Sequence, residues 1–170
     1  MLLLGLGSNL SSSFGDRFEN LNLATAYLQE YKIKIIKRSS FYETPSYPDK
    51  KNPKFINIVV EVSTSLSPEE LASVLLFVEK KLGRKRIKKN EPRTCDIDII
   101  DYNGKVMNFT YKNLIFKVPH EKIIYRNFVL FPLQEIAPKW VHPMNKDSID
   151  VLIKKLSNEE KKSILKITKA

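Results

Sequence analysis

The sequence predicts an α+β fold, in which an antiparallel sheet carries helices on one face and is followed by a C-terminal extension. Short runs rich in β-branched and aromatic residues alternate with two segments whose apolar residues recur at helical spacing. Capping sequences start the helical segments, and glycine, proline or Asn-Gly pairs separate the elements. Over the first 102 residues the predicted order is strand, helix, strand, strand, helix, strand.

The first elements are a strand, a helix and a second strand. Residues 2–7 predict a short buried strand that ends in Gly5-Leu6-Gly7, where glycine favours tight packing of strand against helix. The segment Ser13-Phe14-Gly15-Asp16 has the spacing of a capping box and predicts the start of a helix. In that helix the apolar stripe is Phe14, Phe18, Leu21, Leu28 and Tyr31. Residues 33–43 predict a strand, and three prolines make 45–53 a loop.

A third strand over 55–64 precedes the second helix. Ser67 is the predicted cap of this helix, with Pro68 in its first turn and Glu70 at its third position. Gly83 lies where a left-handed C-terminal cap is expected.

A basic loop over 84–93 leads into a strand over 94–102, which Asn103-Gly104 turns. The remaining pattern is weaker, and we expect Asp147 or Ser148 to cap a last helix that runs to residue 156. Together the elements indicate a ferredoxin-like βαββαβ core within a single domain, 1–170. We expect the sheet face opposite the helices to be free for binding, although this fold serves many functions.

Composition narrows the kinds of partner. Lys and Arg number 29 against 19 Asp and Glu, and the resulting charge of +10 favours polyanions such as nucleic acid, anionic membranes or phosphorylated small molecules. Cys95 is the only cysteine, so an internal disulfide is excluded. The apolar run at residues 1–4 is too short for a signal peptide or a membrane span, and we expect a cytoplasmic protein.

The strand over 94–102 carries the most informative chemistry. Asp96 and Asp98 point to the same face because side chains alternate along a strand. Two aspartates on one face repel each other, a cost that a divalent cation between them would offset, and Mg²⁺ is commonly held by one or two carboxylates plus phosphates. The alternative is a solvated strand face.

Six of the ten residues in the loop 84–93 are basic, and the loop leads directly to this aspartate pair. Phosphoryl transfer needs such cations to neutralise charge on oxygen, whereas the alternative is a solvated charge run. The sequence has neither a P-loop nor the dinucleotide-binding glycine pattern. A zinc site is improbable because no cysteine lies near His120 or His142, and we expect His142 at the surface.

Four ordered segments, which span roughly residues 4–142, resemble the 6-hydroxymethyl-7,8-dihydropterin pyrophosphokinases of folate biosynthesis. The most specific is Pro92-Arg93-Thr94-Cys95-Asp96-Ile97-Asp98, which is similar to the family's Pro-Arg-Thr-x-Asp-hydrophobic-Asp motif. The others are Gly7-Ser8-Asn9-Leu10, Ser39-Ser40-Phe41-Tyr42-Glu43-Thr44-Pro45, and a C-terminal stretch with Val118-Pro119-His120, Arg126, Phe128 and 132–138, which includes Glu135.

The resemblance implies a role for residues at matching positions. The implied ligands of two Mg²⁺ ions are Asp96 and Asp98, and the implied catalytic residues are Arg84, Arg93 and Asp98. The residues that would line the binding site of ATP, the co-substrate, are Glu79, Arg84, Arg86, Arg93, Ile99, His120 and Arg126. The pterin would be bound by Thr44, Pro45, Phe55, Asn57 and Phe128, with the two rings on either side of it. Asn90 and Glu91 depart from the family pattern, and we expect their loop to be mobile or open without ligands.

The implied activity is transfer of pyrophosphate from ATP to 6-hydroxymethyl-7,8-dihydropterin, with AMP as the other product. The implied partners are small molecules, with no nucleic acid and no membrane, and the implied state is a monomer. Two alternatives remain open at this point: a ferredoxin-like nucleic-acid-binding protein, and another two-metal nucleotidyl transferase, which would release pyrophosphate instead of AMP.

Overall fold

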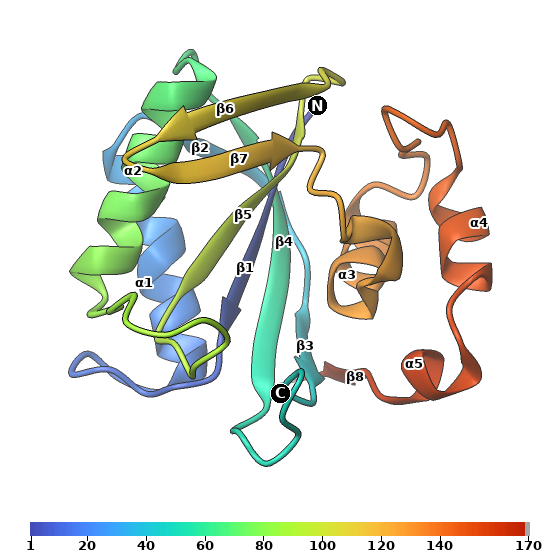
Figure 1. Cartoon of the computed structure of the whole chain (residues 1–170), viewed down its shortest axis with the longest axis horizontal. Helices are drawn as coiled ribbons and strands as arrows, with labels where there is room; N and C mark the ends of the chain where they lie inside the picture. The colour runs from blue at the N-terminus through green and yellow to red at the C-terminus, as the bar shows by residue number, and fades with distance from the viewer. Residues whose placement is uncertain (169–170) are drawn as a thin grey trace.

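The computed structural model describes residues 1–168, and its elements follow the order that the sequence predicts over the first 102 residues. Figure 1 shows the elements: β1 (Leu2–Ser8), α1 (Arg17–Glu30), β2 (Lys34–Arg38), β3 (Phe41–Thr44), β4 (Phe55–Ser63), α2 (Pro68–Lys81), β5 (Asp96–Tyr102), β6 (Met107–Tyr111), β7 (Leu114–Val118), η1 (Ile123–Tyr125), α3 (Asn127–Ile136), α4 (Ile149–Lys154), α5 (Asn158–Lys162) and β8 (Leu165–Ile167). Within this described range, no helix is long and apolar enough to cross a lipid bilayer.

The main sheet is antiparallel and has six strands. Its order is β5-β1-β4-β3-β8, and β2 pairs with the half of β4 that β3 leaves unpaired. On β1, Gly7 is the register partner of both Asp96 on β5 and Asn57 on β4. Residues directly opposite each other in an antiparallel sheet point to the same face. This row therefore brings Asp96 and Asn57 to one face, on either side of a residue without a side chain.

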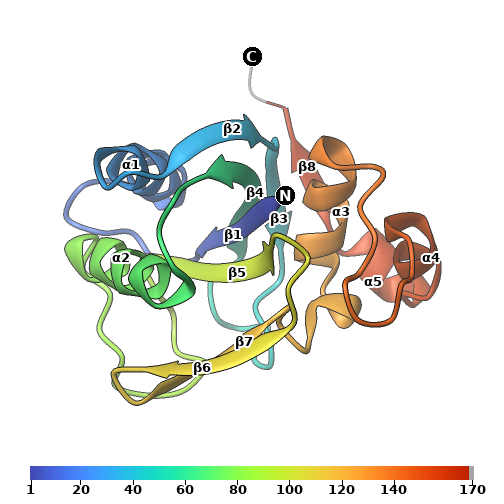
Figure 2. The same cartoon turned by 90° about the horizontal axis from the view of Figure 1, so that it is seen from above.

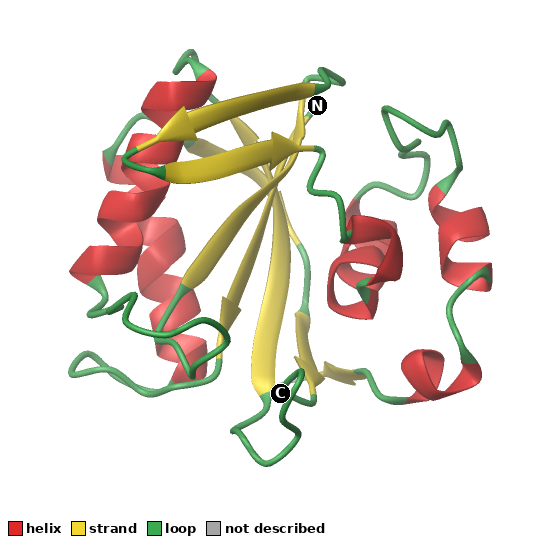
Figure 3. Cartoon of the chain, in the orientation of Figure 1, coloured by secondary structure: helices red, strands yellow, loops and turns green. Residues whose placement is uncertain are grey.

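Helices cover both faces of the sheet (Figures 2 and 3). A first core packs α1 and α2 against one face, and it includes Leu4, Leu6 and Ile58. A second core packs α3 and α4 against the other face, through Leu3, Val59 and Ile100. The ferredoxin-like core is confirmed, but the expectation of a free second face is wrong over this part of the sheet. The C-terminal extension covers it because those strand residues are apolar and need burial.

Two N-terminal expectations need correction. The N-cap of α1 is Asp16, whose side chain accepts from the backbone N–H of Glu19 in a complete capping box, and not Ser13. Phe14 therefore precedes the helix and is exposed instead of contributing to its buried stripe. The strand expected over 33–43 divides into β2 and β3, because Ser39 Oγ accepts from the backbone N–H of Val59 and interrupts the ladder.

The second half agrees with the sequence up to the turn after β5. Ser67 caps α2 with a complete capping box, and Gly83 has a φ of +90° just beyond its end. Asn103 and Gly104 have positive φ values, as their turn requires, but β6 pairs with β7 and not with β5. Ser148 caps α4, which ends at Lys154 and is not the last helix, since α5 follows.

His142 is buried, contrary to the surface position expected for it. Its Nδ1 accepts hydrogen bonds from the backbone N–H groups of Met144 and Asn145, at 3.2 and 3.4 Å. Its ring also lies edge-on to that of Trp140. The residue thus fixes the turn before α4, a structural role that no sequence pattern indicated.

Candidate active site

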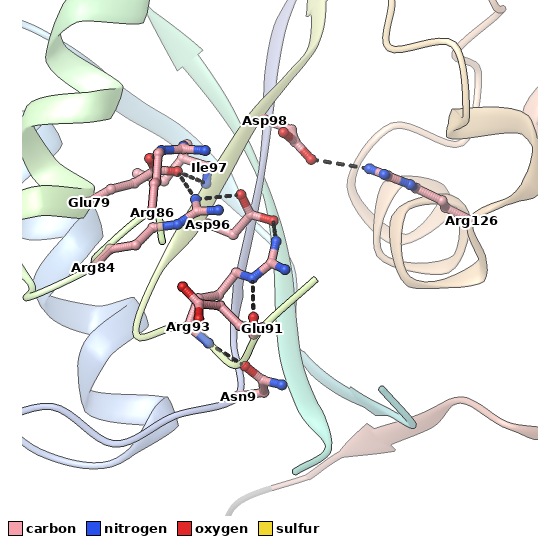
Figure 4. A network of polar contacts seen from close by, with 10 residues as sticks. All are labelled: Asn9, Glu79, Arg84, Arg86, Glu91, Arg93, Asp96, Ile97, Asp98 and Arg126. Atoms are coloured by element: carbon pink, nitrogen blue, oxygen red, sulfur yellow. Dashed lines mark hydrogen bonds and ion pairs between the residues drawn. The ribbon is translucent and has the colours of Figure 1, made fainter. Parts of the chain in front are cut away.

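Two aspartates on β5 form the centre of the candidate site (Figure 4). Ile97 and Ile99 point into the first core, so Asp96 and Asp98 share the opposite face, as alternation predicts. Burial and the negative charge of Asp96 together raise the pKa of Asp98 to about 6. The two carboxylates are therefore close enough to repel each other, a condition that a bound cation would relieve.

Arginines surround both carboxylates. Asp96 Oδ1 accepts from Arg84 Nη1 at 2.9 Å and its Oδ2 accepts from Arg93 Nη1 at 3.2 Å. Burial by itself would raise the pKa of Asp96, but these two arginines hold it below its usual value. Asp98 Oδ2 accepts from Arg126 Nη1 at 3.2 Å, across the gap between β5 and the segment before α3 (Figure 4).

Glu79 lies beneath the arginines, with only 2% of its surface exposed. Its carboxylate accepts from Arg84 Nη1 at 2.7 Å, from Arg86 Nη2 at 2.6 Å and from the backbone N–H of Ile97 at 2.9 Å. Burial, reinforced by the charge of Asp96, raises the pKa of Glu79 to about 7. Glu79 thus joins α2, the basic loop and β5, and it holds two arginines that face the aspartates.

The basic loop 84–93 is anchored at its last residue by two hydrogen bonds to Asn9. Arg93 donates its backbone N–H to Asn9 Oδ1 at 2.8 Å, and the backbone N–H of Asn9 donates to Arg93 O at 3.1 Å. Asn9 Nδ2 donates in turn to Pro53 O at 3.1 Å, which links the loop to the loop 45–53. Sequence reasoning gave Asn9 no role, although it lies in one of the four resembling segments.

Glu91 closes the loop upon itself. Its Oε1 accepts from the backbone N–H groups of Ile87 and Lys88, at 3.2 and 3.3 Å. Asn90 adopts a φ of +62°, a left-handed conformation that asparagine tolerates better than most residues. The departures from the family pattern therefore stabilise one loop conformation, which the sequence did not predict.

A second group of candidate residues begins one strand away. Asn57 on β4 is buried, and its Nδ2 donates to Thr44 Oγ1 at 3.0 Å and to Tyr42 O at 3.4 Å. A Cβ on Gly7 would lie 3.1 Å from Asn57 Oδ1, so glycine makes room for this amide. The strand-to-helix packing expected of Gly7 is thus replaced by contact with Asn57 across the sheet.

The candidate aromatic residues lie next to the arginines. Phe55 on β4 has the guanidinium of Arg93 5.8 Å from its ring centroid, and Phe128 on α3 has that of Arg126 at 5.4 Å. Pro45 is half-buried at the start of the loop that follows β3. The same two arginines therefore contact the aspartates on one side and the aromatic rings on the other.

A cavity of about 160 Å³ opens beside β5 and β7, and its lining includes Asp96, Asp98, Ile99 and His120. Burial and the nearby Arg126 lower the pKa of His120 to about 4, so the ring is neutral at pH 7. His120 Nδ1 accepts from the backbone N–H of Lys122 at 3.1 Å. The proton of the neutral ring is therefore on Nε2, which can donate to a ligand in the cavity.

Comparison with known proteins identifies the family. The model of the 7,8-dihydro-6-hydroxymethylpterin-pyrophosphokinase (HPPK) family matches residues 3–138. The chain belongs to this family. It is 38% identical over 141 residues to the 2-amino-4-hydroxy-6-hydroxymethyldihydropteridine pyrophosphokinase of Aquifex aeolicus, covering 83% of this chain and 82% of the relative. It is 40% identical over 135 residues to the protein of the same name from Bacillus subtilis, covering 79% and 76%.

Other relatives are much longer than this chain. The folic acid synthesis protein fol1 of Pneumocystis carinii is 36% identical over 162 residues, which are 95% of this chain but 21% of that protein. The structure of wild-type Plasmodium falciparum HPPK-DHPS has a TM-score of 0.67 at 19% identity, covering 91% of this chain and 44% of that one. This structural likeness supports the HPPK fold, and the sequence relatives support the family.

The residues present fit a hard divalent cation of the kind implied for HPPK. Asp96 and Asp98 supply carboxylate oxygens on one face, and each oxygen has a second lone pair beside the one that accepts from arginine. Among residues 1–168 no cluster of three or more His, Cys, Asp or Glu side chains could hold a metal by itself. The two carboxylates of Asp96 and Asp98 nevertheless suit Mg²⁺, which takes its remaining ligands from water and substrate phosphates.

Proposed function

We propose that this chain transfers a pyrophosphate group from ATP to 6-hydroxymethyl-7,8-dihydropterin, giving AMP and the pterin pyrophosphate in folate biosynthesis. The observation that carries the proposal is the row Asp96–Gly7–Asn57 across three neighbouring strands. This row supports a site in which the carboxylates and arginines that would bind phosphate lie directly beside the buried amide that would bind a heterocycle. A kinase for a small heterocyclic alcohol requires these two environments side by side.

At the phosphate end, Asp96 and Asp98 would hold two Mg²⁺ ions, which supply neutralisation of charge on the phosphate oxygens. Arg84 and Arg93 would then grip those oxygens, because a guanidinium matches phosphate with parallel hydrogen bonds. The remaining ATP contacts would come from Arg86, Ile99, His120 and Arg126, with Glu79 supporting the two arginines that it binds.

At the pterin end, Asn57, Thr44 and Pro45 would bind the polar edge of the heterocycle, and Phe55 and Phe128 its faces. The hydroxymethyl oxygen then attacks the β-phosphorus of ATP, the bond from that phosphorus to the α-phosphate oxygen breaks, and AMP leaves. Asp98 would also be the carboxylate that orients the attacking hydroxyl or accepts its proton. Exclusion of water by the loops 45–53 and 84–93 would prevent hydrolysis of ATP.

The same proposal extends to the domain organisation, oligomeric state, location and partners of the chain. Residues 1–170 would act as one pyrophosphokinase domain, as a monomer in the cytoplasm, on small molecules and without nucleic-acid or membrane partners. The charge of +10 is then used for phosphate recognition and steering instead of polynucleotide binding.

The test is product analysis after the protein is mixed with MgATP and the hydroxymethyl-dihydropterin. We expect equal amounts of AMP and pterin pyrophosphate, with neither formed when the pterin is omitted. Asp96→Ala is the matched control and should give no product. Release of inorganic pyrophosphate with nucleotide joined to the pterin would identify a nucleotidyl transferase. Absence of reaction together with salt-sensitive RNA binding would identify a nucleic-acid-binding protein and overturn the proposal.

A further inference from the structure

Glu135 belongs to a segment that resembles the family, yet the functions assigned above give it no role. It lies on α3, and its side chain is 27% exposed. Its Oε2 accepts from the hydroxyl of Tyr42 at 2.5 Å, and its Oε1 accepts from the backbone N–H and the Oγ of Ser40, at 3.0 and 2.8 Å. One carboxylate thus ties α3 to β3 and to Ser40, the residue just before that strand.

The strand that Glu135 holds is short. β3 has four residues, and its outer neighbour β8 has three. A strand of this length near the edge of a sheet needs anchoring beyond its backbone ladder. Charge-assisted hydrogen bonds from Tyr42 and Ser40 supply that anchoring. Burial and Glu135 raise the pKa of the Tyr42 hydroxyl well above its usual value, so it stays a donor to the carboxylate at every physiological pH.

β3 in turn fixes the amide of Asn57. Tyr42 is the register partner of Asn57, and its carbonyl accepts one N–H of that amide, while Thr44 Oγ1 accepts from the same nitrogen. Both acceptors lie on β3. With Nδ2 committed to β3, Asn57 offers its Oδ1 as the group left for a ligand, next to Gly7. The amide is therefore presented as an acceptor, which matches a heterocycle that carries N–H donors.

We propose that Glu135 is a positioning residue for the heterocycle: by anchoring Tyr42 and Ser40, it sets β3 so that the amide of Asn57 turns its oxygen toward the ligand. This inference rests on the proposed function, in which Asn57 binds the pterin. Glu135 acts through β3 and touches neither substrate. Loss of the Glu135 side chain should weaken binding of the pterin and reduce the selectivity between related heterocycles. The same loss should leave the binding of ATP unaffected.

The experiment compares Glu135→Ala with Gln134→Ala. Gln134 is the matched control because it is the neighbouring residue on α3, but its side chain donates to Asp150 at 2.8 Å and not to β3. Calorimetry measures the Kd of the hydroxymethyl-dihydropterin in the presence of a non-hydrolysable MgATP analogue, and separately the Kd of that analogue. We expect Glu135→Ala to raise the pterin Kd about tenfold and to leave the nucleotide Kd within about twofold, since one charge-assisted hydrogen-bonded group is lost indirectly. Gln134→Ala should change neither.

Two further single variants, and the double mutant of Tyr42→Phe with Glu135→Ala, separate positioning from general stability. Glu135→Gln keeps the length and one acceptor oxygen, so it should recover most of the pterin affinity. Tyr42→Phe keeps the backbone carbonyl but loses the hydroxyl, and should raise the pterin Kd by a smaller factor. If Glu135→Ala fails to fold, Tyr42→Phe carries the test. The effects of Tyr42→Phe and Glu135→Ala should also be less than additive, because both break the same bond.

The ratio of the affinities for the pterin and for an N-methylated analogue gives a readout that a purely structural role of Glu135 would leave unchanged. An N-methylated pterin lacks one ring N–H donor, and the native protein should bind it much more weakly than the parent. Glu135→Ala should narrow that gap. A folded Glu135→Ala protein with native pterin affinity would overturn the inference alone, as would equal losses for both ligands. A native protein that binds no pterin would overturn the proposed function as well.

Discussion

Arg93→Ala should reduce turnover far more than it weakens the binding of ATP. The reason lies in the partner that Arg93 already has within the protein: its Nη1 donates to Asp96 Oδ2 at 3.2 Å, and both side chains are largely shielded from water. When Arg93 moves to a phosphate it exchanges one charge-assisted hydrogen bond for another. The net gain in the ground state is therefore small, and the larger benefit comes as charge shifts in the transition state.

The expected changes in the Kd of MgATP and in turnover follow from the ground-state and transition-state interactions of Arg93. A charged hydrogen bond contributes about 1.5–3 kcal/mol, but the exchange from Asp96 to phosphate cancels most of that, so we expect the Kd of MgATP to rise less than about threefold. Loss of one preorganised donor to developing charge costs on the order of 100–1,000-fold in turnover. The backbone of Arg93 stays anchored by Asn9 after the substitution, so the loop should keep its position.

The assay combines calorimetry of the MgATP analogue with kcat from AMP formation at saturating substrates. Lys88→Ala is the control, because it removes a positive charge from the same loop at an exposed position. It should change kcat by less than about twofold, as expected for a solvated charge. A thirtyfold weaker Kd for Arg93→Ala with kcat unchanged would refute the reasoning, since the arginine would then act only in ground-state binding.

Four further predictions concern the two aspartates, the pH dependence of the Mg²⁺ requirement, the basic loop and a helix cap. Asp96→Ala and Asp98→Ala should each abolish turnover and keep the native circular dichroism spectrum; near-native activity in either would remove the two-carboxylate mechanism. Because the pKa of Asp98 is raised to about 6, protons compete with Mg²⁺ for this carboxylate below that pH. The Mg²⁺ concentration for half-maximal turnover should therefore rise up to about tenfold per pH unit as the pH falls below 6, and it should be constant above pH 7. Glu91→Gly removes a partly exposed negative charge near the phosphates and the hydrogen bonds that hold the loop, and should lower the Kd of MgATP about threefold by calorimetry. Weaker binding would mean that the loop conformation held by Glu91 is the one that binds ATP. Ser67→Ala should lower the free energy of unfolding in urea by about 1 kcal/mol through loss of the α2 cap, and no change would mean that water replaces the cap.

The parts of the fold that local chemistry determines were predictable from the sequence. Ser67 and Gly83 mark the two ends of α2 because capping needs only neighbouring residues. The start of α1 was misassigned because Ser13 and Asp16 both offer a capping oxygen, and only Asp16 has a glutamate three residues on. The division of 33–43 depends on a hydrogen bond from Val59 to Ser39 across the sheet, which no local pattern encodes.

The candidate site was predictable to a similar degree. Alternation placed Asp96 and Asp98 on one face, and this is what the structure has. The nearness of Asn57 to Asp96 depends on the register of β1 with two different strands, which is a property of the whole sheet. Asn9 and Glu135 were missed as supporting residues because their partners lie 84 and 93 residues away, and sequence spacing carries no signal over such distances.

The second core runs past residue 138, the last residue that the family model matches. Trp140, Ile149, Leu152 and Leu156 all belong to it, and Trp140 Nε1 donates to the buried carboxylate of Asp101 at 2.8 Å. Each such apolar side chain contributes about 1.5–3 kcal/mol when buried, so four of them approach the total stability of a typical domain. A fragment trimmed at residue 138 would expose the inner side of α3 and leave Asp101 without its indole partner. We therefore expect the smallest piece of this chain able to fold alone to extend at least to Leu156, well beyond residue 138, where the match to the family model ends.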